Sequence, residues 1–201
     1  MELNSQYCKV KVSSCTHNQR LYNKLTLTFE INDSHPALDL IEEHYPHKSA
    51  EACAAIDREN QRAAARMARM EGRYVKEPSP APPPSTDMLS ATVLGEERHI
   101  VKLWASPDGT REDGAEPTLK LDGAEMASGS GSAKLSIKED KVVLVFSLLY
   151  PAAELLGSDL SQVHGNSAYL DMEPMQLSLE DHRKRSAADE AISKFKDTLR
   201  R

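Results

Sequence analysis

Paired cysteines, long apolar runs and aromatic side chains are all scarce in this sequence. It has three cysteines in 201 residues, an odd number without the spacing of a disulfide framework. This argues against a secreted, disulfide-stapled domain and for a reducing compartment. No window approaches the roughly 18 uncharged apolar residues of a membrane span. We therefore expect a soluble cytoplasmic protein without a membrane contact.

The motifs of the common enzyme classes are missing as well. The sequence contains no Gly-x4-Gly-Lys phosphate loop, no Gly-x-Gly-x-x-Gly turn, no Gly-x-Ser-x-Gly elbow and no His-Glu-x-x-His helix, the patterns that place phosphate, dinucleotide, nucleophile or zinc chemistry. We expect a protein that is not an enzyme and has no cofactor.

Metal-ligand candidates are few and poorly spaced. His-x2-His and Cys-x-His match none of the strong zinc patterns, so no metal is predicted. A weaker alternative is a metal-dependent enzyme that uses His44 and His47. The full set of candidates is His35, His44, His47, Cys15, His17 and Cys53.

Charge is segregated along the chain, although the formal total is only −6. Residues 88–181 hold 7 basic and 16 acidic side chains, a balance of −9. Residues 58–76 hold six basic and two acidic ones, and residues 182–201 hold seven and three, so each of these stretches has a net charge of +4. Such segregation bears on association rather than on fold.

The first 76 residues open with two predicted strands. Apolar and polar residues alternate from Gln6 to Cys15 and again from Leu25 to Ile31, the period of a strand with one solvated face. No tight turn signal separates them, so we expect a hairpin with a long loop over His17–Asn23.

Two helices are predicted to follow. Asp33 or Ser34 offers an N-cap for a short helix over Ala37–His44, which Pro46 ends. The longest helix is expected from Ser49 to about Tyr74, because Ala, Arg, Met and Gln dominate that stretch and all favour helix.

A proline-rich segment separates this part from the rest. Five prolines fall within Glu77–Ser85, which favours a polyproline spacer. We place a linker and domain boundary at 77–87, before an acidic β-rich unit at 88–181 and a basic C-terminal helix within 182–201. The elements expected there are strands at Ser90–Leu94, His99–Ala105 and Thr118–Leu121, a hairpin of Lys134–Ile137 with Val142–Leu149, a helical turn at Pro151–Leu156 stopped by Gly157, a strand at Ala168–Leu179 and a helix at Ala187–Arg200.

The two parts have similar patterns. In both, a hairpin feeds a helix that starts near a proline, Pro36 in the first part and Pro151 in the second. This predicts an α+β fold of two β-hairpin-plus-helix units, joined by the long amphipathic helix and the Pro-rich linker.

One face of the long helix carries an a/d heptad pattern, which we call the seam. Its residues are spaced 3, 4, 3, 4, 3 and 4 apart, and an Asn at an a position is a device that fixes register in coiled coils. The seam predicts either a homodimer or packing of the helix against its own sheet. Its members are Cys53, Ile56, Asn60, Ala63, Met67, Met70 and Tyr74, of which Ile56, Asn60, Ala63, Met67 and Met70 are the expected self-association residues.

A second face carries five arginines, which we call the basic stripe. Spacings of 4, 4, 3 and 4 keep them within a narrow arc, where they repel one another unless a partner is present. The stripe predicts a contact with phosphates or carboxylates, or simply a solvated face. It consists of Arg58, Arg62, Arg66, Arg69 and Arg73, and a companion cluster is Arg183, Lys184 and Arg185.

The main hypothesis is a non-catalytic binding or accessory protein. Its basic stripe would contact nucleic-acid phosphates without sequence specificity, since aromatic residues for base stacking are few, or an acidic protein. An accessory role in DNA metabolism or in a mobile element fits this profile. The alternative is an inhibitor or adaptor whose acidic unit at 88–181 occupies a basic groove on its target.

Overall fold

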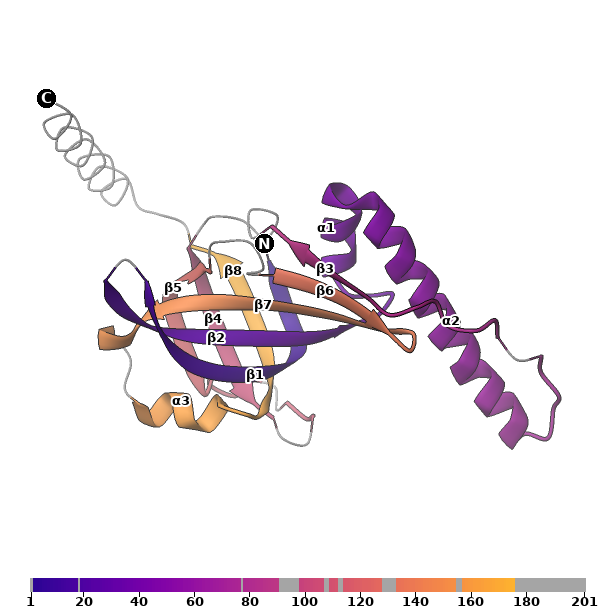
Figure 1. Ribbon diagram of the computed structural model, residues 1–201. Helices are drawn as coiled ribbons and strands as arrows, with labels where there is room; N and C mark the ends of the chain where they lie inside the picture. The colour runs from indigo at the N-terminus through magenta and orange to yellow at the C-terminus, as the bar shows by residue number, and fades with distance from the viewer. Residues whose placement is uncertain are drawn as a thin grey trace, which may run out of the picture.

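The computed structural model describes residues 2–17, 19–76, 78–90, 98–106, 109–111, 114–127, 133–154 and 157–175 (Figure 1). These residues form eight strands and three α-helices, with one short 3-10 helix. The strands are β1 (Leu3–His17), β2 (Arg20–Ile31), β3 (Ser85–Leu89), β4 (His99–Ala105), β5 (Leu119–Met126), β6 (Ala133–Lys138), β7 (Lys141–Pro151) and β8 (Ser167–Pro174). The helices are α1 (Ala37–His44), α2 (Pro46–Met70), η2 (Ala152–Glu154, 3-10) and α3 (Gly157–Val163).

All eight strands belong to one antiparallel sheet. Its order is β2-β1-β8-β4-β5-β7-β6-β3, and β2 also pairs with β7. The strands β2, β1, β8, β4, β5 and β7 therefore close into a ring. One edge of β7 binds β6 along Val142–Phe146 and then β5 at Leu148 and Leu149, so β6 and β3 extend the sheet from the ring.

The core fills the inside of this ring. Leu25, Leu27 and Phe29 on β2 have no exposed surface, and the residues between them face outward, as the pleat requires. Phe29 stacks on Phe146 of β7, with ring centroids 5.2 Å apart and planes 15° apart. Burial of these apolar side chains is the main free-energy term that favours the closed sheet.

Helices cover two sides of the ring (Figure 1). Ala37 and Ile41 of α1 and Ala52, Ala55 and Ile56 of α2 belong to the core cluster. On another side, α3 packs on β1, β4 and β5 and buries Val163 completely. None of the described helices has both the length and the apolar character that a bilayer span requires.

The predicted fold class is wrong. The two hairpins form, but β2 pairs with β7 over ten residue pairs, from Tyr22↔Pro151 to Ile31↔Val142. The hairpins therefore share one sheet instead of forming two α+β units. The long helix exists, but it does not join separate units, because β1 and β2, which precede it, pair with β8 and β7, which follow it.

The β1–β2 hairpin is tighter than predicted. His17 pairs with Arg20, so a two-residue turn replaces the long loop expected over His17–Asn23. Gln19 in this turn has a φ of 62°. The end of the hairpin extends beyond the covered part of the sheet, where Thr16 and Leu21 are exposed. A strand segment without a buried face shows no alternation of apolar and polar residues, so this end of the hairpin cannot be predicted from the sequence pattern.

The bounds of α1 are confirmed as Ala37–His44, but the predicted N-cap is wrong. Neither Asp33 nor Ser34 caps the helix. Instead, the N–H of Ala37 donates to Nδ1 of His35 over 3.1 Å. His35 is buried, and its ring lies edge-on to Phe29, 5.6 Å between centroids. Pro46 ends α1 as predicted and also begins α2, a position where its missing N–H costs nothing.

Other boundaries differ from the prediction. The segment Ser85–Asp87 of the expected linker lies in β3. Most of the strand expected at Ser90–Leu94 falls within residues 91–97, which lie outside the described part of the chain. β4 and the β6–β7 hairpin are confirmed. β5 is longer than expected. The helical turn expected at Pro151–Leu156 is present as η2, and Gly157 begins α3. The rest of the strand expected at Ala168–Leu179 and the helix at Ala187–Arg200 lie outside the described residues.

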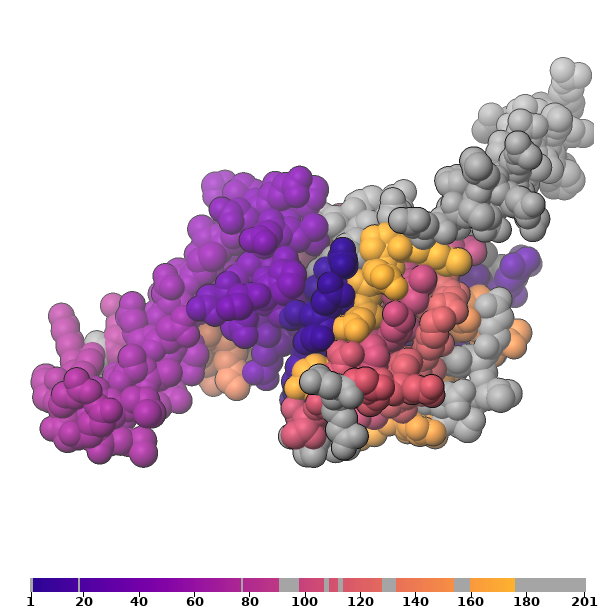
Figure 2. Space-filling view, turned by 180° about the vertical axis from the view of Figure 1, so that it is seen from behind, coloured from indigo at the N-terminus to yellow at the C-terminus, as the bar shows by residue number. Residues whose placement is uncertain are grey.

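The second half of α2 leaves the sheet. Figure 2 shows it and the chain that follows standing out from the body of the molecule. The helix ends at Met70, where Gly72 takes a φ of 74° and reverses the chain, and the Pro-rich segment runs back along α2 to β3 (Figure 1). Ala65 is buried on the helix, and Pro78, Ala81 and Pro82 of the returning segment are half-buried.

Candidate functional site: the second half of α2

The basic stripe is anchored at its first two members by one carboxylate. Nε of Arg58 donates to Oδ1 of Asp140 over 3.0 Å. Nη1 of Arg62 forms an ion pair with Oδ2 of the same residue over 2.6 Å. The Asp140 side chain is fully buried. The middle of α2 is therefore fixed to the β6–β7 turn.

The rest of the stripe is more exposed. Arg66 lies 3.8 Å from Glu59, with 69% of its side chain exposed. Arg73, past the end of the helix, pairs with Glu71 and is 71% exposed. Arg69 is exposed too and has an interaction within the chain. Exposed pairs of this kind contribute little free energy, about 0 to 1 kcal/mol. The companion cluster of Arg183, Lys184 and Arg185 lies outside the described residues.

The seam is divided between the core and solvent. Ile56 is buried in the core, whereas Asn60 and Ala63 are exposed. The exposed fractions of Met67 and Met70 are 60% and 83%. Asn60, Ala63, Met67 and Met70 therefore lie on one solvated face, which we call the open face of α2. Ile56 instead packs against its own chain. Cys53 and Tyr74 are also exposed.

A groove lies between α2 and the returning Pro-rich segment. Its volume is about 350 Å³, and Glu51, Ala54 and Arg58 of α2 face Pro82–Ser85 and Ile137 across it. The polyproline stretch therefore runs beside the first half of the helix. The sequence pattern places these prolines in a spacer and does not indicate this arrangement.

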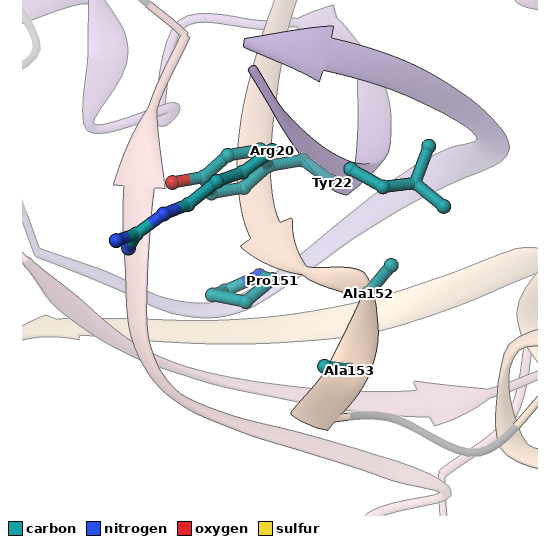
Figure 3. A pocket seen from close by; sticks show the side chains of 6 residues that line it. Arg20, Tyr22, Pro151, Ala152 and Ala153 are labelled. Carbon is teal, nitrogen blue, oxygen red and sulfur yellow. The ribbon is translucent and has the colours of Figure 1, made fainter. Parts of the chain in front are cut away.

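A second, larger groove lies at the end of the β1–β2 hairpin (Figure 3). Its volume is about 590 Å³, and Arg20, Leu21 and Tyr22 line it with Pro151, Ala152 and Ala153. Figure 3 shows Arg20 and Tyr22 beside one another, near Pro151. Among the described residues, this lining has one cation and one phenol but no carboxylate, thiol or imidazole.

The metal-ligand candidates are not gathered into a site. His44 lies 3.9 Å from its neighbour Glu43, and His35 is committed to the cap of α1. Across the described residues, no three His, Cys, Asp or Glu side chains are placed to share a metal ion.

A cluster that no sequence pattern indicates lies on the outer face of the sheet. Nε1 of Trp104 donates to the carbonyl of Ala115 over 2.8 Å, and the Arg111 guanidinium lies 3.8 Å above the indole ring. Arg111 also donates to Ser5 Oγ over 3.0 Å and lies 3.6 Å from Asp171. These contacts tie the β4–β5 connection to β1 and β8. These contacts join residues that are far apart in the sequence, so no local sequence pattern predicts them.

The comparisons with known proteins give no relative. No protein-family model matches this chain, and neither the curated proteins nor the solved structures contain a match to it.

Proposed function

We propose that this chain is a non-catalytic binding protein that contacts an anionic partner through the second half of α2. The observation that carries the proposal is a protruding helix whose arginines are exposed. Beyond the anchored Arg62, residues 63–76 hold four basic side chains and one acidic side chain, a net charge of +3. Such a concentration of charge steers association with an anionic surface.

The division of the basic stripe supports this role. Arg58 and Arg62 hold the helix to Asp140, so they serve to position it. Arg66, Arg69 and Arg73 lie beyond this anchor. Since the contacts of Arg66 and Arg73 with Glu59 and Glu71 are solvent-exposed, replacing them by contacts to an external anion costs little.

The proposal includes a cellular location and a biological context. A cytoplasmic location and an accessory role near DNA rest on the sequence pattern alone. Self-association through the open face of α2 is a second form of the contact. The exposure of Met67 and Met70 favours it, and the net charge of +3 that residues 63–76 of each copy would bring opposes it. The alternative of an adaptor whose acidic residues at 88–181 fill a basic groove predicts no affinity for polyanions.

Fluorescence anisotropy with labelled poly-L-glutamate and with double-stranded DNA, at several salt concentrations, tests the proposal. We expect affinity that falls with salt. The triple variant Arg66→Gln/Arg69→Gln/Arg73→Gln should weaken binding at low salt at least tenfold. A matched control, Lys9→Gln/Lys11→Gln/Lys134→Gln, removes three exposed charges from the sheet. Equal loss in both variants, or no binding to either polyanion, contradicts the proposal.

A further inference from the structure

We infer that the anionic partner is a protein with an apolar groove rimmed by carboxylates, and that the second half of α2 inserts into it with Met67 and Met70 as anchors. This inference rests on the proposed function and adds the chemistry of the partner. It is carried by the exposed methionines and by the charge beside them.

The open face of α2 is apolar where the helix protrudes. Ala63, Met67 and Met70 follow one another at spacings of 4 and 3, which aligns them along one side of a helix. Within the described chain, the two methionine side chains remain 60% and 83% exposed. Methionine is flexible and polarizable, so it adapts to grooves of varied shape.

Arginines flank this apolar face. Arg66 precedes Met67 and is 69% exposed, and its long aliphatic stem can cover apolar surface while its guanidinium reaches a carboxylate. Basic groups beside an apolar helix face are the pattern of helices that bind in acidic, apolar-lined grooves, where each anchor fills a pocket. Charge and shape therefore specify the same kind of partner.

A protein fits this face better than a nucleic acid does. Two of the five arginines in the basic stripe are already bound to Asp140, which removes cations that a phosphate backbone would need. Methionines gain nothing from phosphates. Stacking platforms for bases need several aromatic rings, and Tyr74 is the only aromatic residue between positions 46 and 76.

A second copy of this chain fits less well. Each copy would bring a net charge of +3 over residues 63–76, so two such segments repel. The seam face is also covered by the chain's own body at Ile56, which is 7% exposed. A parallel partner helix would collide with that body, which leaves only the short stretch from Asn60 to Met70 for contact.

The structure presents this helix in an ordered form before binding. Asp140 fixes its middle, and the Pro-rich segment faces its first half across a groove that reaches Arg58. A helix that is held in advance loses less conformational entropy when it binds. The anchors are therefore offered at fixed positions, as recognition by a groove requires.

Calmodulin serves as the probe, because calcium opens a methionine-rich apolar groove in this acidic protein. The full-length chain is titrated against calmodulin by calorimetry, with calcium and with a chelator. We expect binding with calcium and at least tenfold weaker binding with the chelator, although calmodulin without calcium is more negatively charged. Equal binding in both conditions would mean that charge alone is recognised and would overturn the inference.

The anchors are tested with Met67→Gln/Met70→Gln. This variant should weaken calcium-calmodulin binding tenfold or more and leave poly-L-glutamate binding unchanged. The control is Met88→Gln, because Met88 is 64% exposed on β3, and less than a twofold change is expected. Thermal unfolding confirms that both variants fold.

The outcomes separate the two proposals. If the unmodified chain binds neither poly-L-glutamate nor double-stranded DNA, the proposed function fails. If it binds either of them, but calmodulin does not bind or is insensitive to the methionine substitutions, only the present inference fails. Tighter binding to DNA than to calcium-calmodulin, or a dimer in sedimentation that the methionine substitutions dissociate, would also overturn it.

Discussion

Arg58 and Asp140, 82 positions apart in the sequence, are joined by a hydrogen bond of 3.0 Å from Nε to Oδ1. The carboxylate is fully buried and also contacts Arg62. Removal of an ionised carboxylate from water costs several kcal/mol unless cations and hydrogen bonds compensate. The two arginines therefore compensate the charge of Asp140 in the β6–β7 turn, and this contact holds the middle of α2 against the sheet.

Asp140→Asn should lower the free energy of unfolding by about 2 kcal/mol, as measured by urea denaturation. Loss of one partner from a buried ion pair costs about 3–5 kcal/mol. A smaller value is expected here, because the side chains of Arg58 and Arg62 are 20% and 32% exposed and can rehydrate. Asn tolerates the positive φ of 65° at this position, so the turn itself is preserved.

Glu139→Gly is the control for this turn. Glu139 is exposed, with a φ of 54°, a conformation that suits glycine. We expect no loss of stability, or a gain of up to about 1 kcal/mol. If Asp140→Asn were as stable as the unmodified protein, Asp140 would not anchor α2.

Local patterns in the sequence predict much of this fold. The alternation over Leu25–Ile31 and the nearly continuous apolar run over Val142–Leu149 predict both strands. The limits of α1 follow from Pro36 and Pro46. Patterns of this kind report which side of an element is buried, and they act over a few residues.

Pairing between distant strands is not contained in such patterns. Nothing in residues 22–31 indicates that they pair with residues 142–151, so the two hairpins are taken for separate units. The partner of Arg58 is hidden for the same reason, since Asp140 resembles any acidic turn residue. The spacing of the arginines is visible in the sequence, whereas the burial of their counter-ion is not.

His35 should make stability depend on pH. Burial lowers the pKa of this imidazole below its usual value of 6.5, and its Nδ1 accepts the N–H of Ala37 only when unprotonated. The unfolded chain therefore binds the proton more readily than the folded chain does. The contribution of neutral His35 to stability is complete above pH 6.5 and is lost as the pH falls toward the lowered pKa. Thermal unfolding between pH 7.5 and 5 measures this loss.

The variant His35→Asn isolates the contribution of this residue from that of the other histidines. Asn offers an oxygen acceptor to Ala37 and does not titrate. Its melting temperature should fall less steeply with decreasing pH than that of the unmodified protein. Identical slopes would show that His35 does not titrate in this range.

Arg111→Met should expose Trp104 to solvent. The guanidinium covers the indole ring and links the β4–β5 connection to Ser5 and Asp171. Trp104 is the only tryptophan in the chain, so a red shift of its emission and stronger quenching by acrylamide report directly on this contact. A stability loss of about 1 kcal/mol is expected. Unchanged quenching would contradict the contact.

The cysteines should differ sharply in reactivity. Burial raises the pKa of the Cys8 thiol to about 12, and the side chain lies in the core, whereas Cys53 is exposed on α2. Because the thiolate is the reactive form, Ellman's reagent at pH 8 should modify Cys53 in the folded protein and Cys8 only after unfolding. Rapid modification of Cys8 under native conditions would contradict its placement.

Closure of the sheet can be tested by a disulfide between β2 and β7. Thr26 and Ser147 are directly opposite each other, and their hydroxyl oxygens lie 3.2 Å apart. Opposed cross-strand residues have the Cβ separation that a disulfide needs. Thr26→Cys/Ser147→Cys should therefore oxidise to an intrachain disulfide, identified by peptide mass mapping. The control Thr28→Cys/Ser147→Cys is offset by two residues and should form little of it. Equal yields would show that β2 and β7 do not pair in this register, and the closed ring would be wrong.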